Sequence, residues 1–285
     1  MLHGLELLVP AVCKGREVGY MEFSRKDSYT VQDLLAIVEI LRSPGGCPWD
    51  REQTHESIRK NLIEETYEVA DAIDQQDTHL LCEELGDLLL QVMLHTEMEK
   101  EKGTFTFDDV CDGLCKKLVY RHPHVFGQAV ANTSEQVVAN WEPLKNAEKG
   151  RKTAADRLNS VPQSLPALMK SEKLQKRAAE FGFAYNSAGQ AMADLEAEVQ
   201  ELKEAIATGE NTVGELGDVL FAAVNVAGKL HTDAEEALTL SAGRFAARVK
   251  KAEELAAAGG ENIAEAGPEK RDALWKQAKA LLKEQ

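Results

Sequence analysis

The sequence Glu64-Glu65-Thr66-Tyr67-Glu68 is followed along the chain by Glu84-Leu85-Gly86-Asp87. On α-helices, residues three apart share a face, so each stretch carries a pair of carboxylates, Glu65 with Glu68 and Glu84 with Asp87. Two such helices packed together bring all four carboxylates into one small volume, where burial and repulsion favour the protonated forms. Divalent cations keep such acids ionised, and oxygen ligands alone suit Mg²⁺ or Mn²⁺. The two stretches therefore predict a helical Mg²⁺ site that acts on a phosphate ester or anhydride.

The alternative is that these acids line solvated helix faces, as they do on most Glu-rich helices. The residues around Asp87 are largely apolar: Leu85, Leu88, Leu89, Val92 and Met93. This composition predicts a mostly buried helix, and buried acids are rarely left unpaired. The surroundings of Asp87 thus favour the metal site over a solvated face.

The composition argues against several classes of function. The 285-residue chain has a formal net charge of −15 at pH 7, whereas nucleic acids are bound by clustered Lys and Arg. No apolar run approaches the roughly 18 residues of a membrane span, so we expect neither nucleic acid nor membrane as a partner. The five cysteines include no C-x-x-C pair, which is typical of reduced thiols and of a cytoplasmic protein.

Apolar spacing predicts an all-α fold. In the first half, the expected helices cover residues 31–41, 54–74, 78–102, 107–120 and 134–149, and a break is expected at 121–126. Asp77 or Thr78 can cap the third helix, and Gly103 ends it. Residues 1–28 lack a helical period, and we expect them to be a poorly ordered extension or an artefact of the assigned start.

The second half of the chain repeats the first. The acidic pairs recur as Glu198-Val199-Gln200-Glu201 and Glu215-Leu216-Gly217-Asp218, at offsets of 133 (198 − 65) and 131 (215 − 84). Gly182–Asn186 matches Gly46–Asp50, and the basic pair Arg244 and Arg248 matches Lys117 and Arg121. Recurrence in the same order predicts a duplicated domain. We expect a first helical domain over 29–150, a linker over 151–165 and a second helical domain over 166–285.

The duplicated acidic pattern resembles the MazG family of nucleoside triphosphate pyrophosphohydrolases. Two loop motifs strengthen the resemblance: Gly46-Cys47-Pro48-Trp49-Asp50 and Arg121-His122-Pro123-His124-Val125-Phe126. The resemblance runs from about Val31 to the C-terminus. It implies an all-α homodimer that hydrolyses nucleoside triphosphates to monophosphates and diphosphate with Mg²⁺, with broad base specificity, and so removes surplus or aberrant nucleotides.

The same resemblance places hydrolysis in the second copy. Its expected metal ligands and catalytic acids are Glu198, Glu201, Glu215 and Asp218. The first copy offers Glu65, Glu68, Glu84 and Asp87, either as a second active site or as a structural repeat. Cleavage between the α and β phosphates needs cations that neutralise phosphoryl charge and activate water, which agrees with these ligands.

Several residues are candidates for contact with the nucleotide. Arg244 and Arg248 match the nucleotide-contacting pair of the family, and Trp275 matches its base-contacting tryptophan. The basic residues Lys173, Lys176 and Arg177 either meet the triphosphate or lie on a solvated helix face. Trp49 and Tyr185 either stack on a base or pack in the core.

Two departures from the family pattern keep another function open. Ala197 stands where the first copy has Glu64, and Asn211 stands where relatives often carry Lys. The alternative is a catalytically silent helical module that binds nucleotides or a regulatory partner. A di-iron site is disfavoured, because it needs two E-x-x-H units and the sequence offers only the one ending at His55.

Overall fold

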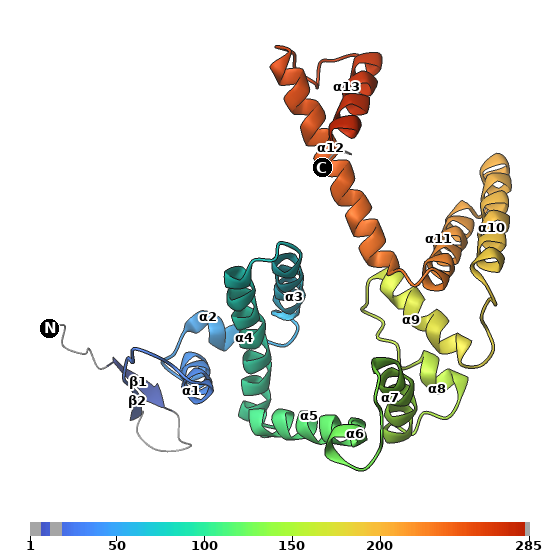
Figure 1. Cartoon of the computed structure of the whole chain (residues 1–285). Coiled ribbons are helices and arrows are strands. Elements are labelled where there is room, and N and C mark those ends of the chain that lie inside the picture. The colour runs from blue at the N-terminus through green and yellow to red at the C-terminus, as the bar shows by residue number, and fades with distance from the viewer. Residues whose placement is uncertain (1–6, 12–18, 283–285) are drawn as a thin grey trace. The chain divides into compact units, whose positions relative to one another are not determined.

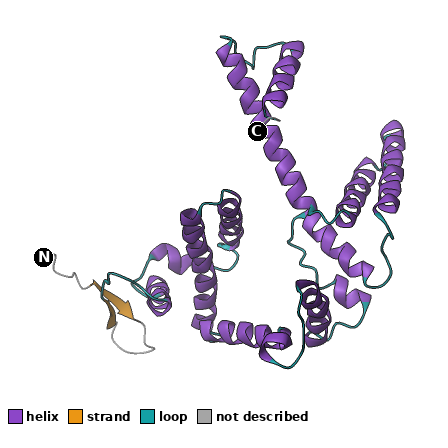
Figure 2. Cartoon of the chain, in the orientation of Figure 1, coloured by secondary structure: helices purple, strands orange, loops and turns teal. Residues whose placement is uncertain are grey.

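The structure is a computed structural model that describes residues 7–11 and 19–282. Helices make up almost all of this part of the chain, as Figure 2 shows, so the all-α prediction is confirmed. The exception is a hairpin in which β1 (Leu7–Ala11) pairs antiparallel with β2 (Gly19–Phe23), an element that the sequence did not predict. Of the expected N-terminal extension, residues 1–6 and 12–18 lie outside the described residues.

The chain divides into two compact units, Met1–Trp141 and Glu142–Gln285. No helix of the described ranges combines the length and the apolar composition that crossing a membrane requires. The four described cysteines, Cys47, Cys82, Cys111 and Cys115, are free thiols, and Cys13 lies outside the described residues. The assignment of residues 151–165 as a linker between two repeats stays a prediction, and this range contains the short helix α8 (Ala154–Leu158).

The first unit is built around the pair formed by its two long helices, α3 and α4 (Figure 1). Its helices are α1 (Val31–Arg42), α2 (Pro48–Glu52), α3 (Arg59–Asp74), α4 (Thr78–Lys102), α5 (Phe107–Arg121) and α6 (Pro123–Phe126), and α7 (Ser134–Glu148) crosses the boundary between the units.

Local sequence signals set several of these helix ends. The Asp77 carboxylate accepts hydrogen bonds from the backbone N–H groups of His79 and Leu80 and so caps α4. Gly103 ends the same helix with φ of 73°, a left-handed conformation that glycine adopts without steric cost. The start of α5 is held by a capping box between Thr106 and Asp109.

One local prediction in this unit was wrong. Helix α3 begins at Arg59 and not near residue 54, because Thr54 and Ser57 bond to each other's backbone: the Thr54 N–H donates to Ser57 Oγ at 2.9 Å, and the Ser57 N–H donates to Thr54 Oγ1 at 3.2 Å. The break expected at 121–126 is confirmed, because α5 ends at Arg121 and His122 is not helical; one further helical turn follows over residues 123–126, with Pro123 at its first position, which suits its fixed φ.

The core of the first unit lies between α1 and α4, beside the turn that precedes α3. Its buried residues are Val38, Ile58, Met93, Leu94 and Met98. The buried residues of α4 therefore lie in its second half, whereas the predicted metal ligands Glu84 and Asp87 lie in its first half. This arrangement anchors α4 and leaves Glu84 and Asp87 outside the core.

The second unit contains two helix hairpins (Figure 1). Its helices are α8, α9 (Ala167–Ala179), α10 (Ala188–Thr208), α11 (Thr212–Lys229), α12 (Ala234–Ala258) and α13 (Pro268–Leu281). A tight turn that contains Gly209, with φ of 77°, joins α10 to α11. The hairpin of α12 and α13 packs through small and apolar residues: Ala252, Ala256, Leu274 and Ala278.

Candidate metal sites and nucleotide-contacting residues

The two predicted acid sets lie on two helix hairpins, α3 with α4 and α10 with α11. Short turns join each pair, so the two helices of a hairpin run in opposite directions and pack along their length. The i, i+3 spacing places the acids of each helix on one face. Each hairpin can therefore present acids from both of its helices to one point.

In the first hairpin, one carboxylate oxygen each from Glu65, Glu84 and Asp87 lie within 4.8 Å of one another. Burial raises the pKa of Glu65, and the charge of Asp87 and the interaction with Glu68 raise it further. The pKa of Glu84 is raised by burial and then by the charge of Glu68. Three of the four predicted acids thus form one group, and Glu68 lies close enough to affect two of them.

In the second hairpin, one carboxylate oxygen each from Glu198, Glu201 and Glu215 lie within 4.8 Å of one another. The pKa of Glu198 is raised by burial, then by the charges of Glu201 and Asp218. Asp218 is the fourth predicted acid, and its charge reaches the group from one turn further along α11. The structure therefore brings together three acids in each set and leaves the fourth beside them.

The donor chemistry of both groups fits Mg²⁺. Each supplies three carboxylate oxygens and no nitrogen or sulfur, and Mg²⁺ prefers a small number of carboxylates with its other positions taken by water and substrate phosphates. Crowded carboxylates, which here raise the pKa of Glu65, Glu84 and Glu198, are the arrangement that a divalent cation relieves.

A contact at the start of α11 was not foreseen from the sequence. Asn211 Nδ2 donates a hydrogen bond to Glu215 Oε1 at 2.8 Å. Asn211 has φ of 49°, and its amide lies over Gly214, where a Cβ would come within 2.5 Å of Asn211 Oδ1. The residue that departs from the family pattern thus contacts one of the candidate metal ligands directly. Asparagine is among the few residues that adopt a positive φ readily, and this could have indicated a helix start but not the contact.

The three basic residues of α9 are in different environments. Arg177 Nη1 bonds to Glu142 Oε2 at 2.6 Å and to Glu180 Oε1 at 3.0 Å, and its side chain is 15% exposed. Lys176 pairs with Glu172 at 2.5 Å on the helix surface, and Lys173 is exposed. Arg177 therefore links α9 to Glu142 and Glu180 through ion pairs, whereas Lys173 and Lys176 lie on the surface.

The structure brings two other predicted residues together. The guanidinium carbon of Arg248 lies 5.9 Å from the centre of the Trp275 ring, and the Phe245 ring lies 5.5 Å from the same ring. Arg244 is exposed one turn before Arg248 on α12. These contacts join α12 to α13.

The two other aromatic candidates also differ. Trp49 is 57% exposed, so it lies at the surface and not in the core. Tyr185 is half-buried, and its hydroxyl donates to Asp194 Oδ2 at 2.6 Å, which raises the pKa of Tyr185 to about 12. Tyr185 is therefore tied to α10, the helix that carries Glu198.

A histidine pair in the first unit was not predicted from the sequence. His55 Nδ1 lies 2.7 Å from His95 Nδ1, and His55 Nε2 lies 2.7 Å from Glu99 Oε1. The spacing of His95 and Glu99 places them one turn apart on α4, and this could have indicated a shared partner. The E-x-x-H stretch that ends at His55 therefore ends in a contact with α4.

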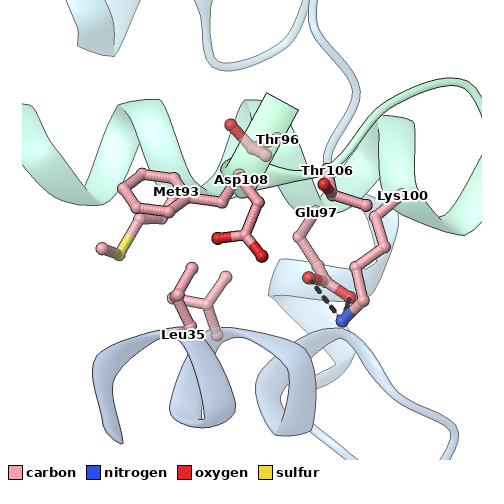
Figure 3. A pocket seen from close by; sticks show the side chains of 9 residues that line it. Leu35, Met93, Thr96, Glu97, Lys100, Thr106 and Asp108 are labelled. Atoms are coloured by element: carbon pink, nitrogen blue, oxygen red, sulfur yellow. Dashed lines mark hydrogen bonds and ion pairs between the residues drawn. The ribbon is translucent and has the colours of Figure 1, made fainter. Parts of the chain in front are cut away.

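A separate cavity of about 230 Å³ lies between α1, α4 and α5. Figure 3 shows Met93 and Leu35 at one end and the Glu97–Lys100 ion pair, at 3.2 Å, at the other. The lining contains none of the predicted metal ligands or nucleotide-contacting residues.

Comparison with known proteins gives a consistent result. The MazG nucleotide pyrophosphohydrolase domain matches residues 53–126, a range that contains the acidic group of the first hairpin. A nucleoside triphosphate pyrophosphohydrolase of Escherichia coli K12 is 40% identical over 254 residues, which cover 87% of this chain and 97% of the relative. The nucleoside triphosphate pyrophosphohydrolase/pyrophosphatase MazG of Thermotoga maritima is 42% identical over 248 residues, which cover 87% and 95%. A shorter match of 178 residues, 40% identical, covers 61% of this chain and 53% of a nucleoside triphosphate pyrophosphohydrolase of Mycobacterium tuberculosis.

Proposed function

The chain belongs to the MazG nucleotide pyrophosphohydrolase family, and from this premise we propose that it is a Mg²⁺-dependent nucleoside triphosphate pyrophosphohydrolase. The reaction is the hydrolysis of a nucleoside triphosphate to a nucleoside monophosphate and diphosphate. The observation that carries the proposal is the convergence of Glu198, Glu201 and Glu215 on one point. We favour this second group as the catalytic one, and the first group is a second active site or a structural repeat.

In this proposal, the acids of α10 and α11 hold Mg²⁺ through carboxylate oxygens. Bound there, Mg²⁺ neutralises charge on the phosphoryl oxygens and lowers the pKa of a water molecule. The protein's own task is to fix the ligands: the helical period sets the spacing of Glu198 and Glu201, and the hairpin brings Glu215 to the same point. Asp218, beside the group, is available as a further ligand or to orient water.

The basic residues of α12 and α9 are the proposed partners of the triphosphate. Arg244 and Arg248 supply guanidinium groups that match phosphate geometry, and Lys173 and Lys176 supply exposed point charges. Arg177 plays a structural part in this arrangement, because it is bound to Glu142 and Glu180.

We also propose a cytoplasmic homodimer of broad base specificity that removes surplus or aberrant nucleotides. Support for a dimer comes from α11, where the side chains of Leu216 and Leu220 are 50% and 51% exposed. Apolar side chains in such positions favour an interface over solvent.

A catalytically silent module that binds nucleotides or a regulatory partner is the second candidate. Two observations favour it: Ala197 stands where the first copy has an additional acid, Glu64, and the amide of Asn211 occupies an oxygen of Glu215. Both features weaken a metal site without destroying the helix hairpin.

The identity of the products separates these functions. The purified protein is incubated with ATP, GTP and dUTP and with Mg²⁺, and the nucleotides are resolved by ion-exchange chromatography. The proposal expects monophosphate and diphosphate, with no product in EDTA. Nucleoside diphosphate and phosphate would contradict cleavage between the α and β phosphates, and the absence of turnover would favour the silent module.

A further inference from the structure

The two histidines that meet in the first unit do so through ring nitrogens. His55, in the turn before α3, and His95, on α4, have their Nδ1 atoms 2.7 Å apart. The ring planes are within 10° of parallel and the ring centres are 5.0 Å apart. Because the Nδ1 atoms are much closer together than the ring centres, the rings meet edge to edge. Two imidazoles in this arrangement can share either a proton or a cation.

The carboxylate of Glu99 determines which nitrogen of His55 carries the proton. His55 Nε2 lies 2.7 Å from Glu99 Oε1. Hydrogen bonds from Lys102, Thr104 and His55 lower the pKa of Glu99 to about 2, so this carboxylate is ionised and can only accept. His55 therefore has its proton on Nε2 and a lone pair on Nδ1. A carboxylate bonded to the outer nitrogen is the usual support of a metal-binding histidine.

His95 is suited to act as the second ligand. Burial lowers its pKa, and the nearby His55 lowers it further, so the ring is neutral at neutral pH. Neutral imidazole is the form that binds metals. Without a cation, His95 Nδ1 donates its hydrogen to His55 Nδ1. When a cation binds, this proton moves to His95 Nε2 and the ring releases no proton overall.

The charges around the pair favour a cation. Glu56 and Glu99 are carboxylates beside His55, and Lys102 is the ammonium group that bonds to Glu99. Hydrogen bonds from its own backbone N–H and from Thr54 lower the pKa of Glu56, so it is ionised as well. Two negative charges and one positive charge leave a local net charge of −1, which attracts a cation to neutral imidazoles.

A buried oxygen on α4 lacks a donor near the same pair. Gln91 lies one helical turn before His95, so both side chains share a face of the helix. Its side chain is 5% exposed, and in the described part of the chain Gln91 Oε1 has no hydrogen-bond partner. Buried acceptors of this kind are normally satisfied by protein or by bound water. Water held by a cation at the histidines would supply the missing donor.

This pair differs from the acidic groups in chemistry and in place. Imidazole nitrogens suit Zn²⁺, Ni²⁺ and Cu²⁺, whereas carboxylates alone suit Mg²⁺. His95 follows Asp87 by eight residues (95 − 87 = 8), which is about 12 Å along α4. By the offset that relates Glu84 to Glu215, His95 corresponds to Val226 (95 + 131 = 226), so the second unit lacks this ligand.

We propose that His55 and His95 bind a divalent transition-metal ion such as Zn²⁺ through their Nδ1 atoms, with Glu99 orienting His55. Zn–N bonds of about 2.0–2.1 Å in a tetrahedral site place the two nitrogens roughly 3.3 Å apart, so the pair must open by about 0.6 Å. His55 lies outside the helices, and its turn can supply this movement. Water fills the remaining positions. The bound ion ties the turn before α3 to α4, so it stabilises the first unit.

The test uses Zn²⁺ and the histidine ring nitrogens themselves. The full chain, with its thiols reduced and with excess Mg²⁺ to saturate the oxygen-only sites, is titrated with Zn²⁺ and followed by ¹⁵N NMR of the histidine side chains. We expect the Nδ1 signals of His55 and His95 to shift together and to saturate at one Zn²⁺ per chain. Zn²⁺ bound by cysteine thiolates would leave these signals in place. Thermal unfolding of the same samples should show a higher Tm with Zn²⁺.

Variants separate the two ligands from their support. We expect His55→Gln and His95→Gln to weaken Zn²⁺ binding at this site at least about 100-fold, and Glu99→Gln to weaken it about 10–100-fold, the usual effect of losing a carboxylate behind a metal ligand. The rise in Tm should be lost in the histidine variants. His79→Gln, at an exposed histidine of the same helix, is the matched control and should change neither measurement.

Several outcomes would overturn the assignment. These are the absence of any Zn²⁺-dependent shift at His55 and His95, unchanged Zn²⁺ affinity in both histidine variants, or a shift confined to the other adjacent pair, His122 and His124. If His95→Gln loses helicity, His55→Gln decides, because His55 lies outside the helices. Hydrolysis is not measured, so the result is independent of the proposed function.

Discussion

Arg248 and Trp275 form a cation–π pair, with the guanidinium carbon 5.9 Å from the centre of the indole ring. The first unit contains a similar pair, in which Arg121 lies 5.7 Å from the ring of Trp141. Arg121 and Arg248 are the two residues that correspond in the predicted repeat. In each unit, a tryptophan from a later helix therefore packs against the arginine. This contact limits the directions in which the guanidinium group can point.

Loss of the Trp275 ring should weaken substrate binding through Arg248. We expect Trp275→Ala to raise KM for ATP about threefold to tenfold, since cation–π contacts contribute about 0.5–1 kcal/mol at exposed sites and the ring also orders the arginine. Trp275→Phe retains a ring and should restore most of the loss. Steady-state kinetics of the two variants measure the effect, and a fall in kcat at constant KM would contradict this role.

The second acidic group should be required for turnover. We expect Glu201→Ala and Asp218→Ala to lower Mg²⁺-dependent hydrolysis at least about 100-fold, because even residues outside the first coordination shell of a metal contribute 10–100-fold. Circular dichroism should show unchanged helicity, since Glu201 and Asp218 are exposed.

Glu68→Ala and Asp87→Ala are the matched changes in the first group. If the second copy alone catalyses, these variants retain turnover. Activity that survives in the second-group variants and disappears in the first-group variants would move the active site to the hairpin of α3 and α4.

Release of Glu215 from Asn211 should strengthen the metal site. Asn211→Gly removes the amide that bonds to Glu215 Oε1, and glycine accepts the φ of 49° at this position. We expect the Mg²⁺ concentration for half-maximal activity to fall about threefold, with little change in thermal stability. A rise in that concentration would instead show that the amide orients Glu215 for the metal.

The histidine pair should make the stability of the first unit depend on pH. Burial lowers the pKa of His95, and the nearby His55 lowers it further. The folded chain therefore resists protonation at a pH where the unfolded chain already takes up a proton, so stability falls as the pH drops below the ordinary histidine value of about 6.5. Urea unfolding at pH 8 and pH 5.5 should show this loss in the unaltered chain and a smaller loss in His95→Gln. His79→Gln, at an exposed histidine of the same helix, should retain the full loss.

Local patterns in the sequence were sufficient for most of the helices. The periods and caps predicted α1, α4 and α5 to within about one residue, because Asp77, Gly103 and the apolar spacing act over a single turn of chain. The start of α3 was missed because side-chain bonds between Thr54 and Ser57 compete with the helix there.

The sequence by itself determined which acids share a helix face, since that follows from the helical period alone, and the spacing of the carboxylates was therefore enough to predict both acidic groups. Only the tertiary structure decided what surrounds them. The bond from Tyr185 to Asp194 depends on how the loop after α9 meets α10, and the contact between His55 and His95 joins residues 40 apart in sequence. The cleft of about 560 Å³ that Phe183, Tyr185 and Asn225 help to line exists because α9 packs beside α11. Such contacts depend on the packing of whole helices, which no short-range period in the sequence specifies.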